Sequence, residues 1–198
     1  MYVCTVMARN LEFNEDEAVK KAMEVFWEKG YAGTSIRDLA DAMHIQISSI
    51  YNTMGDKHQL FIKCIRSYTQ ARAMDAQAHA AKIKSPLKAI ISFINDAVNA
   101  ILYSTNSCLA IKTTFEVAAT DPDLQAILRE DNDFTHQFLA GLINKAIALK
   151  ELDVDTDAAT LTDFIINNFT GWHESYIIHK DPIKIKKMSK YLVDQISR

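Results

Sequence analysis

The segment GTSIRDLADAMHIQISSIYNTMGDKHQLF (residues 33–61) contains two short helical patterns separated by only a few residues. Apolar residues recur at helical spacing in both patterns, first at Ile36, Leu39, Ala40 and Met43 and then at Ile47, Ile50, Tyr51 and Met54. Helices this short are not stable alone in water, because nucleating a helix is costly and few hydrogen bonds offset that cost. The two helices must therefore pack against each other and against a further element.

Local signals define the ends of these two helices. Ser35 can cap the first helix, with Asp38 three residues later in the capping-box position. We expect this helix to end near Met43, a turn at residues 44–45, and the second helix to begin near Gln46. This spacing predicts a helix-turn-helix, a motif that inserts its second helix into the major groove of DNA.

The second helix of this pair has an apolar and a polar face. The predicted small core comprises Phe26, Leu39, Ala40, Ile45 and Ile50. The face left outside comprises Gln46, Ser48, Ser49 and Asn52. Gln and Asn side chains can pair with adenine edges, and Ser accepts several partners. A helix start capped at Thr34 or Ser35 also offers backbone N–H groups to a phosphate. The alternative is an ordinary pair of short helices with a solvated face.

Helical periodicity continues through the rest of the chain, and no run of alternating residues predicts a strand. Cap residues followed by proline mark three helix starts, at Ser85–Pro86, Asp121–Pro122 and Asp181–Pro182. The other expected helices comprise one ending at Gly30, one from Lys57 to about Ala81, one over 106–119 and one from about Thr156 to His179. We predict an all-α fold of about nine helices, with a three-helix domain at 1–56 and a larger helical domain at 57–198.

Composition favours a soluble, cytoplasmic protein. Among 198 residues there are only 5 Gly and 3 Pro, and the net charge is −3. No apolar run approaches the roughly 20 residues that a membrane span needs, and the first residues do not resemble a secretory signal. Met7 opens a stretch that itself reads like a natural start, so residues 1–6 are open to interpretation as an extension.

Cysteine and histidine usage predicts neither a disulfide framework nor a metal site. Cys4, Cys64 and Cys108 are far apart and form no CxxC pair, which fits a reducing compartment. Redox sensing by Cys108 is one interpretation, and a buried structural thiol is the favoured one. The six histidines lack HxxxH or HExxH spacing. We expect no metal and no cofactor.

Residues 26–61, FWEKGYAGTSIRDLADAMHIQISSIYNTMGDKHQLF, resemble the N-terminal DNA-binding region of the TetR family of bacterial transcriptional regulators. Their last part, SIYNTMGDKHQLF, looks like the ending common in that family, and residues 107–128 look like one family subgroup. The matching positions are Phe26, Gly30, Tyr31, Thr34, Ser35, Ile36, Leu39, Ala40, Ile45, Ser49, Ile50, Tyr51, Lys57 and Leu60. The sequence departs from the family pattern at His44, Ile47 and Met54.

The resemblance and the helical pattern together predict how the domain meets double-stranded DNA. The helix at 46–52 reads bases, while Thr34, Tyr51 and Lys57 hold the DNA backbone. The full predicted DNA-binding set is Thr34, Ser35, Gln46, Ile47, Ser48, Ser49, Tyr51, Asn52 and Lys57. Residues 1–58 carry six basic and nine acidic side chains, a net charge of −3. Phosphate attraction normally drives DNA affinity, so binding should need two subunits acting together or specificity from short polar contacts.

The larger domain is expected to bind a ligand, as the resemblance implies, between the helices at about 85–150 and 156–179. The predicted lining comprises Phe93, Tyr103, Phe115, Glu116, Phe138, Asn168 and Trp172. The effector should then be small and apolar or amphipathic, with a hydrogen-bonding or cationic group near Glu116. Alternatively, Glu116 is a structural carboxylate, and Asn168, Trp172 and His173 are core or interface residues on the helix at 156–179.

The last two helices carry more apolar surface than one subunit can bury. A helix with two apolar faces must bury both, which predicts a symmetric homodimer. The predicted interface comprises Phe164, Phe169, Tyr176, Met188 and Leu192 and buries on the order of 2,000 Å² or more. The sequence therefore predicts a ligand-responsive, dimeric repressor of transcription that is not an enzyme. The alternative is a helical small-molecule carrier or enzyme on the same fold without DNA binding.

Overall fold

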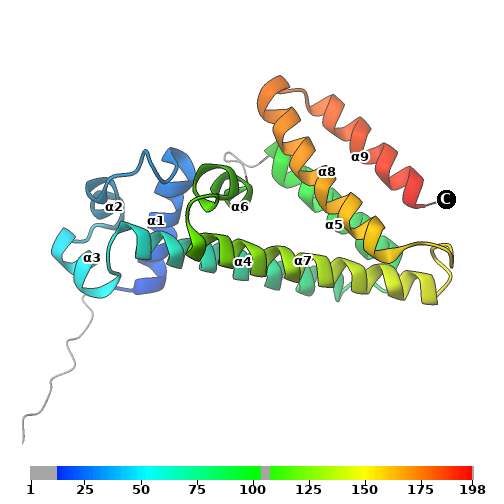
Figure 1. Cartoon of the computed structure of the whole chain (residues 1–198), viewed down its shortest axis with the longest axis horizontal. Helices are drawn as coiled ribbons and strands as arrows, with labels where there is room; N and C mark the ends of the chain where they lie inside the picture. The colour runs from blue at the N-terminus through cyan, green and yellow to red at the C-terminus, as the bar shows by residue number, and fades with distance from the viewer. Residues whose placement is uncertain (1–12, 104–107, 198) are drawn as a thin grey trace, which may run out of the picture. The chain divides into compact units, whose positions relative to one another are not determined.

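The computed structural model describes residues 13–103 and 108–197, and every regular element within these ranges is helical (Figure 1). Within these two ranges the chain forms nine α-helices and one π-helix, which confirms the all-α prediction. The interpretation of residues 1–6 as an extension lies outside the described residues. The chain divides into two compact units, the first ending at Cys64 and the second beginning at Ile65.

The first unit is a small three-helix domain closed by the start of a fourth helix. It comprises α1 (Glu15–Lys29), α2 (Ile36–Met43), α3 (Ile47–Thr53) and the first turns of α4 (Lys57–Ala80). Its fully buried side chains include Phe26, Leu39, Ile50, Met54, Leu60 and Phe61. The ring centroids of Phe26 and Phe61 lie 4.7 Å apart. Ile45, predicted in this core, is only half-buried.

The boundary between the units falls inside α4, eight residues after the predicted one at 56/57. Leu60, Phe61 and Cys64 on the first two turns of α4 are buried in the first unit. The Cys64 thiol donates to the Val19 carbonyl at 3.6 Å, and burial raises its pKa to about 12. These side chains therefore make the first two turns of α4 part of the first unit.

The second unit is built on four long helices: α5 (Pro86–Tyr103), α7 (Pro122–Ala148), α8 (Ala158–His179) and α9 (Pro182–Ile196). The predicted caps are present, since Asp121 and Asp181 each accept two backbone N–H groups of the helix that follows. Its core comprises Ile90, Ile94, Val98, Ile101, Leu102, Leu139, Ile143, Ala146, Ile165, Trp172, Ile185, Leu192 and Ile196. No helix in the described ranges is long and apolar enough to cross a membrane.

The predicted single helix over 106–119 is wrong in detail. Within the described part of this range, α6 (Leu109–Thr113) is followed directly by a π-helix, η1 (Thr114–Ala118). A π-helix has a wider turn, with hydrogen bonds from residue i to i+5, and such turns often occur at functional sites. Apolar periodicity at 3.6 residues cannot show this change of turn, because it depends on packing against the neighbouring helices.

Candidate nucleic-acid interface and ligand cavity

The turn between α2 and α3 fixes the angle of the helix-turn-helix. His44 adopts a left-handed conformation, with φ 58° and ψ 42°, and its N–H donates to the carbonyls of Ala40 and Asp41. The next N–H, of Ile45, also donates to the Ala40 carbonyl, at 3.1 Å. Glycine is favoured at such a position, and histidine is among the side chains that tolerate it. The departure from the family pattern at His44 therefore keeps the turn.

The start of α2 is held by the predicted capping box. The Ser35 hydroxyl accepts the Asp38 N–H at 3.1 Å, and the Asp38 carboxylate accepts the Ser35 N–H at 2.8 Å. Hydrogen bonds from Lys29 and from Ser35 keep the pKa of Asp38 well below its ordinary value. The first turn of α2 is thereby fixed in the position where the resemblance implies a phosphate contact.

Thr34 holds the loop before α2. Its side chain is buried, and its hydroxyl donates to the Gly30 carbonyl at 2.6 Å. Its backbone N–H donates to the Tyr31 carbonyl at 3.3 Å. Both donors of Thr34 are therefore engaged within the domain, and its contact with DNA remains a prediction.

The predicted reading face of α3 points to solvent. Gln46, Ser48 and Asn52 are exposed, Tyr51 is half exposed at 53%, and Ser49 is half-buried. Gln46 is the N-cap residue, but its side chain makes no capping hydrogen bond. Ile50 on the opposite side of α3 is fully buried and anchors the helix to the core. The α3 segment thus presents exposed polar side chains to solvent, and the N-cap side chain of Gln46 makes no capping hydrogen bond.

Lys57 begins α4 and lies close to the loop that precedes α2. Its Nζ donates to the carbonyls of Tyr31 and Thr34, each at 3.0 Å. The same Nζ lies 4.3 Å from the centroid of the Tyr31 ring, a cation–π contact. Because an ammonium group has three N–H donors, these two bonds leave a third for another acceptor such as a phosphate oxygen.

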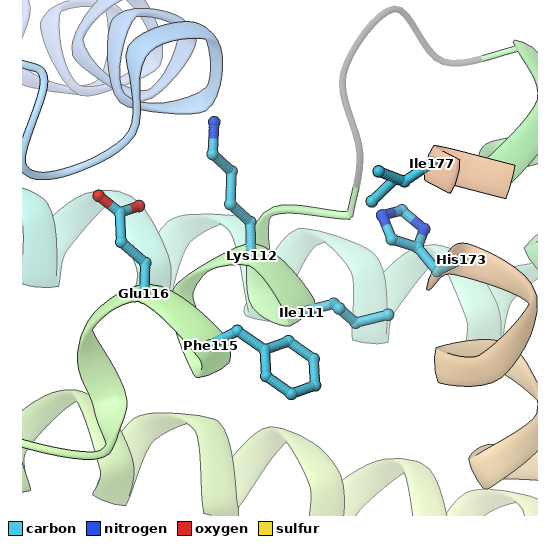
Figure 2. Close-up of a pocket in the computed structure, with 6 residues that line it drawn as sticks. All are labelled: Ile111, Lys112, Phe115, Glu116, His173 and Ile177. Atoms are coloured by element: carbon cyan, nitrogen blue, oxygen red, sulfur yellow. The ribbon is translucent and has the colours of Figure 1, made fainter. Parts of the chain in front are cut away.

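A cavity of about 440 Å³ lies in the second unit between the α6–η1 segment and α8. It is lined by Ile111, Lys112, Phe115, Glu116, His173 and Ile177. In Figure 2, Ile111, Lys112, Phe115 and Glu116 project from the α6–η1 segment, and His173 and Ile177 project from α8. The cavity lining therefore combines three apolar side chains with an imidazole, a lysine and a glutamate.

Two of the seven predicted pocket residues, Phe115 and Glu116, line this cavity. Phe93, Phe138 and Trp172 do not; they lie in an aromatic cluster with Phe169. Within it, Phe93 is 5.7 Å from Phe138 and 5.8 Å from Phe169, and Phe169 is 5.7 Å from Trp172, between ring centroids. Aromatic side chains at helical spacing can fill a core or line a cavity; here Trp172 is buried in the core and Phe93 packs against it.

The other two predicted pocket residues are engaged elsewhere. Tyr103 is exposed, and its hydroxyl accepts a hydrogen bond from Lys186 at 3.0 Å. The side-chain amide of Asn168 donates to the Phe164 carbonyl one turn earlier on α8, at 2.7 Å. Neither residue lines the cavity described above.

His173 is one of four cavity residues that the predicted set omitted, with Ile111, Lys112 and Ile177. Its side chain is 4% exposed, and neither ring nitrogen has a hydrogen-bond partner among the described residues. The sequence placed it on an apolar helix, where a buried histidine is most often a satisfied core residue. Only the tertiary structure, which places residues of α8 and of the α6–η1 segment around one cavity, shows that His173 lines it.

Acid should destabilise the second unit through His173. Burial lowers the pKa of its imidazole below the ordinary 6.5. The unfolded chain therefore binds this proton at a higher pH than the folded chain does, so the free energy of unfolding falls as the pH drops through 6.5. Between about pH 7 and pH 5, the melting temperature of His173→Gln should depend less on pH than that of the wild type.

Circular dichroism melts across this pH range measure the effect. The exposed His179 at the end of the same helix provides a matched variant, His179→Gln, which should keep the wild-type dependence. Equal pH dependence in the wild type and in His173→Gln would show that the folded state does not disfavour the charged imidazole.

The exposed apolar residues of α8 and α9 only partly coincide with the predicted dimer interface. Phe164 is 57% exposed in the single chain, whereas Leu192 is buried in the core of its own unit. Phe169, Tyr176 and Met188 pack as half-buried side chains against that same core. Leu192 is therefore not available to a second subunit. Four other apolar side chains on these two helices are exposed but were not in the predicted interface: Ile177, Ile178, Ile183 and Tyr191.

Comparisons with known proteins agree with this architecture. Residues 85–192 match the family model described as "Tetracyclin repressor-like, C-terminal domain", and residues 18–64 match that described as "Bacterial regulatory proteins, tetR family". The uncharacterized HTH-type transcriptional regulator YezE of Bacillus subtilis (strain 168) is 29% identical over 162 residues, covering 80% of this chain and 84% of YezE. The HTH-type transcriptional repressor ComR of Escherichia coli (strain K12) is 24% identical, covering 77% and 74%.

A solved structure shares the fold along most of its length. The TetR family transcriptional regulator CifR, a cysteine mutant complexed with a 26-bp operator DNA, superposes with a TM-score of 0.80 at 20% identity, covering 92% of this chain and 97% of CifR. The fold and the α2–α3 geometry define a helix-turn-helix transcriptional regulator, which the matches favour over a carrier or an enzyme without DNA binding. The chain belongs to the TetR family of bacterial regulatory proteins, with an N-terminal DNA-binding domain and a C-terminal ligand-binding domain.

Proposed function

We propose that this regulator is a cytoplasmic homodimer that represses transcription by binding a palindromic operator, and that an effector in the cavity changes its affinity for that operator. The observation that carries the proposal is the exposed polar face of α3, held by a buried Ile50 and a turn of fixed geometry. The relative ComR is named a repressor, and the structural neighbour CifR is complexed with operator DNA, which supports the same role here.

The test is binding to a palindromic fragment from the region upstream of the protein's own gene. The dimer should bind this fragment more tightly than a scrambled one, with affinity falling as salt rises. Because residues 1–58 carry a net charge of −3, we expect a shallower salt dependence than that of a strongly basic DNA-binding domain. Equal affinity for the palindromic and scrambled fragments would contradict operator recognition.

The identity of the bases read should depend on the two exposed amide side chains of the α3 segment. An Asn or Gln bidentate to adenine contributes about 1–3 kcal/mol of discrimination. Gln46→Ala or Asn52→Ala should therefore relax sequence preference at one operator position while leaving binding to random DNA nearly unchanged. Affinities measured against operators with single base-pair changes would show this. Ser48→Ala, on the same exposed face, is the matched control and should change preference less.

The proposed switch uses α4 to connect the two domains. α4 begins at Lys57 in the first unit and continues to Ala80 in the second. In a symmetric dimer the two recognition helices must lie about 34–36 Å apart to enter successive major grooves, so a small tilt of this helix changes DNA affinity. The effector would shift the population of tilts only by its difference in affinity for them.

Reciprocal linkage tests whether the cavity operates this switch. A true effector must change operator affinity, and operator DNA must change effector affinity by the same factor. Phe115 and Glu116 line the cavity, so Phe115→Ala should weaken effector binding and its effect on DNA together. A ligand that binds in the cavity but leaves operator affinity unchanged would separate the cavity from the switch.

A further inference from the structure

His173 is the most deeply buried polar group of the cavity. It projects from α8, is 4% exposed, and has both ring nitrogens without a hydrogen-bond partner in the described ranges. Buried polar groups in folded proteins are almost always hydrogen-bonded, because leaving one unpaired forfeits its interaction with water. The ring faces the cavity beside Ile177 and opposite Ile111 (Figure 2), so an occupant of the cavity can supply the missing partner.

The protonation state of His173 limits what that partner can be. Burial lowers the pKa of the imidazole, and the positive charge of Lys180 lowers it further. The other charged groups at the cavity are Lys112 and Glu116. Near neutral pH the ring is uncharged, with one nitrogen donating and the other accepting a hydrogen bond. It therefore suits a hydroxyl, which can accept and donate, or a carbonyl, which accepts.

The other lining residues favour a ligand with a largely apolar body. Ile111, Phe115 and Ile177 are the apolar residues of the lining. A volume of about 440 Å³ lies within the range of small-molecule sites. Glu116 is exposed, unlike His173, so water competes for the hydrogen bonds of its carboxylate. Among the polar groups of the lining, His173 is the most deeply buried, and its hydrogen bonds therefore discriminate most strongly between ligands.

We propose that His173 is the polar anchor of this cavity, and that the cavity takes an uncharged, largely apolar molecule whose hydroxyl or carbonyl group hydrogen-bonds to the imidazole. The proposal rests on the proposed function of the cavity as the effector site. The residue that orients the ligand is then His173 and not Glu116. The ligand should accordingly carry an uncharged polar group and not a cationic one.

The test compares two probes with nearly the same body, naphthalene and 1-naphthol, which is uncharged near pH 7. Binding to the full-length protein is measured by fluorescence titration without DNA. In a purely apolar cavity naphthalene should bind more tightly, because the hydroxyl group of 1-naphthol would lose its hydrogen bonds with water on binding. With His173 as anchor, we expect 1-naphthol to bind roughly three- to tenfold more tightly.

Three variants locate the origin of this preference. His173→Phe should bind naphthalene at least as well as the wild type and lose the preference for 1-naphthol. His173→Gln restores a hydrogen-bonding side chain and should recover part of the preference. Glu116→Gln, which keeps the shape of the side chain, should leave the preference unchanged. Circular dichroism melts confirm that each variant is folded.

Several outcomes would overturn the proposal. These are a wild type without preference, a preference that survives His173→Phe or disappears in Glu116→Gln, and failure of both probes to bind up to their solubility limits. The ¹⁵N resonances of the His173 ring give a second readout, and should move with 1-naphthol but hardly with naphthalene. Unmoved resonances would show that water satisfies the ring. None of these readouts involves operator DNA, so failure of operator binding or of effector linkage is distinguishable from failure of the anchor.

Discussion

Replacing Phe164 by aspartate should convert the dimer into monomers at micromolar concentration. Phe164 lies on α8 with 57% of its surface exposed in the single chain, so its side chain has little to pack against there. In a symmetric dimer the substitution occurs twice, and burying two unpaired carboxylates at about 2 kcal/mol each would raise the dimer dissociation constant several-hundredfold. Sedimentation velocity at several concentrations measures this constant directly.

A glycine on α8 offers an independent test of the same interface. Gly171 lies seven residues after Phe164, on the same side of the helix, and a Cβ placed there would meet no atom of the chain within 4 Å. Glycine inside a helix is unfavourable by about 1 kcal/mol relative to alanine, so its presence suggests close approach by another helix. Gly171→Leu should therefore leave a folded chain but weaken the dimer.

Gly141 on α7 provides the matched control. A Cβ at this glycine also meets no atom within 4 Å, so Gly141→Leu makes the same change on a different helix. We expect this variant to remain dimeric. If both leucine variants dimerise like the wild type, and Phe164→Asp does as well, the interface does not lie on this face of α8.

The parts of the fold that were predictable from the sequence are those decided within a few residues. Ser35 and Asp38 form their capping box, and the cap-then-proline pairs at 121–122 and 181–182 begin helices where expected. Each of these signals acts through hydrogen bonds between neighbouring residues in the chain. For the same reason, the turn at His44 forms although glycine is absent there.

The parts that were not predictable depend on contacts between residues far apart in the chain. Apolar periodicity shows that a helix has a buried face but not whether a core or a cavity lies beneath it. Phe93 and Trp172 were therefore assigned to the pocket and Leu192 to the dimer interface, whereas the structure places all three against the core. The two ring nitrogens of His173 have no hydrogen-bond partner among the described residues. This depends on tertiary contacts, which no local sequence pattern shows.

Lys57 illustrates how a predicted DNA contact can also be structural. Its Nζ binds the carbonyls of Tyr31 and Thr34, which lie 26 and 23 residues earlier in the chain. Hydrogen bonds from charged donors contribute about 1.5–3 kcal/mol, so Lys57→Met should lower the stability of the first unit. It should also weaken binding to operator and random DNA by similar factors, because a phosphate contact carries no sequence information.

Salt dependence separates these two roles of Lys57. Losing one phosphate contact per subunit should flatten the plot of log affinity against log salt by about 0.9 for each contact, or roughly 1.8 for the dimer. Lys57→Arg keeps the charge and should keep the slope, even if its planar donors fit the two carbonyls less well. Lys20→Met removes the same charge from an exposed position on α1 and serves as the control. If Lys57→Met loses stability and affinity but flattens the slope no more than Lys20→Met does, Lys57 acts only by holding the loop before α2. The third N–H of its ammonium group would then not reach the DNA backbone.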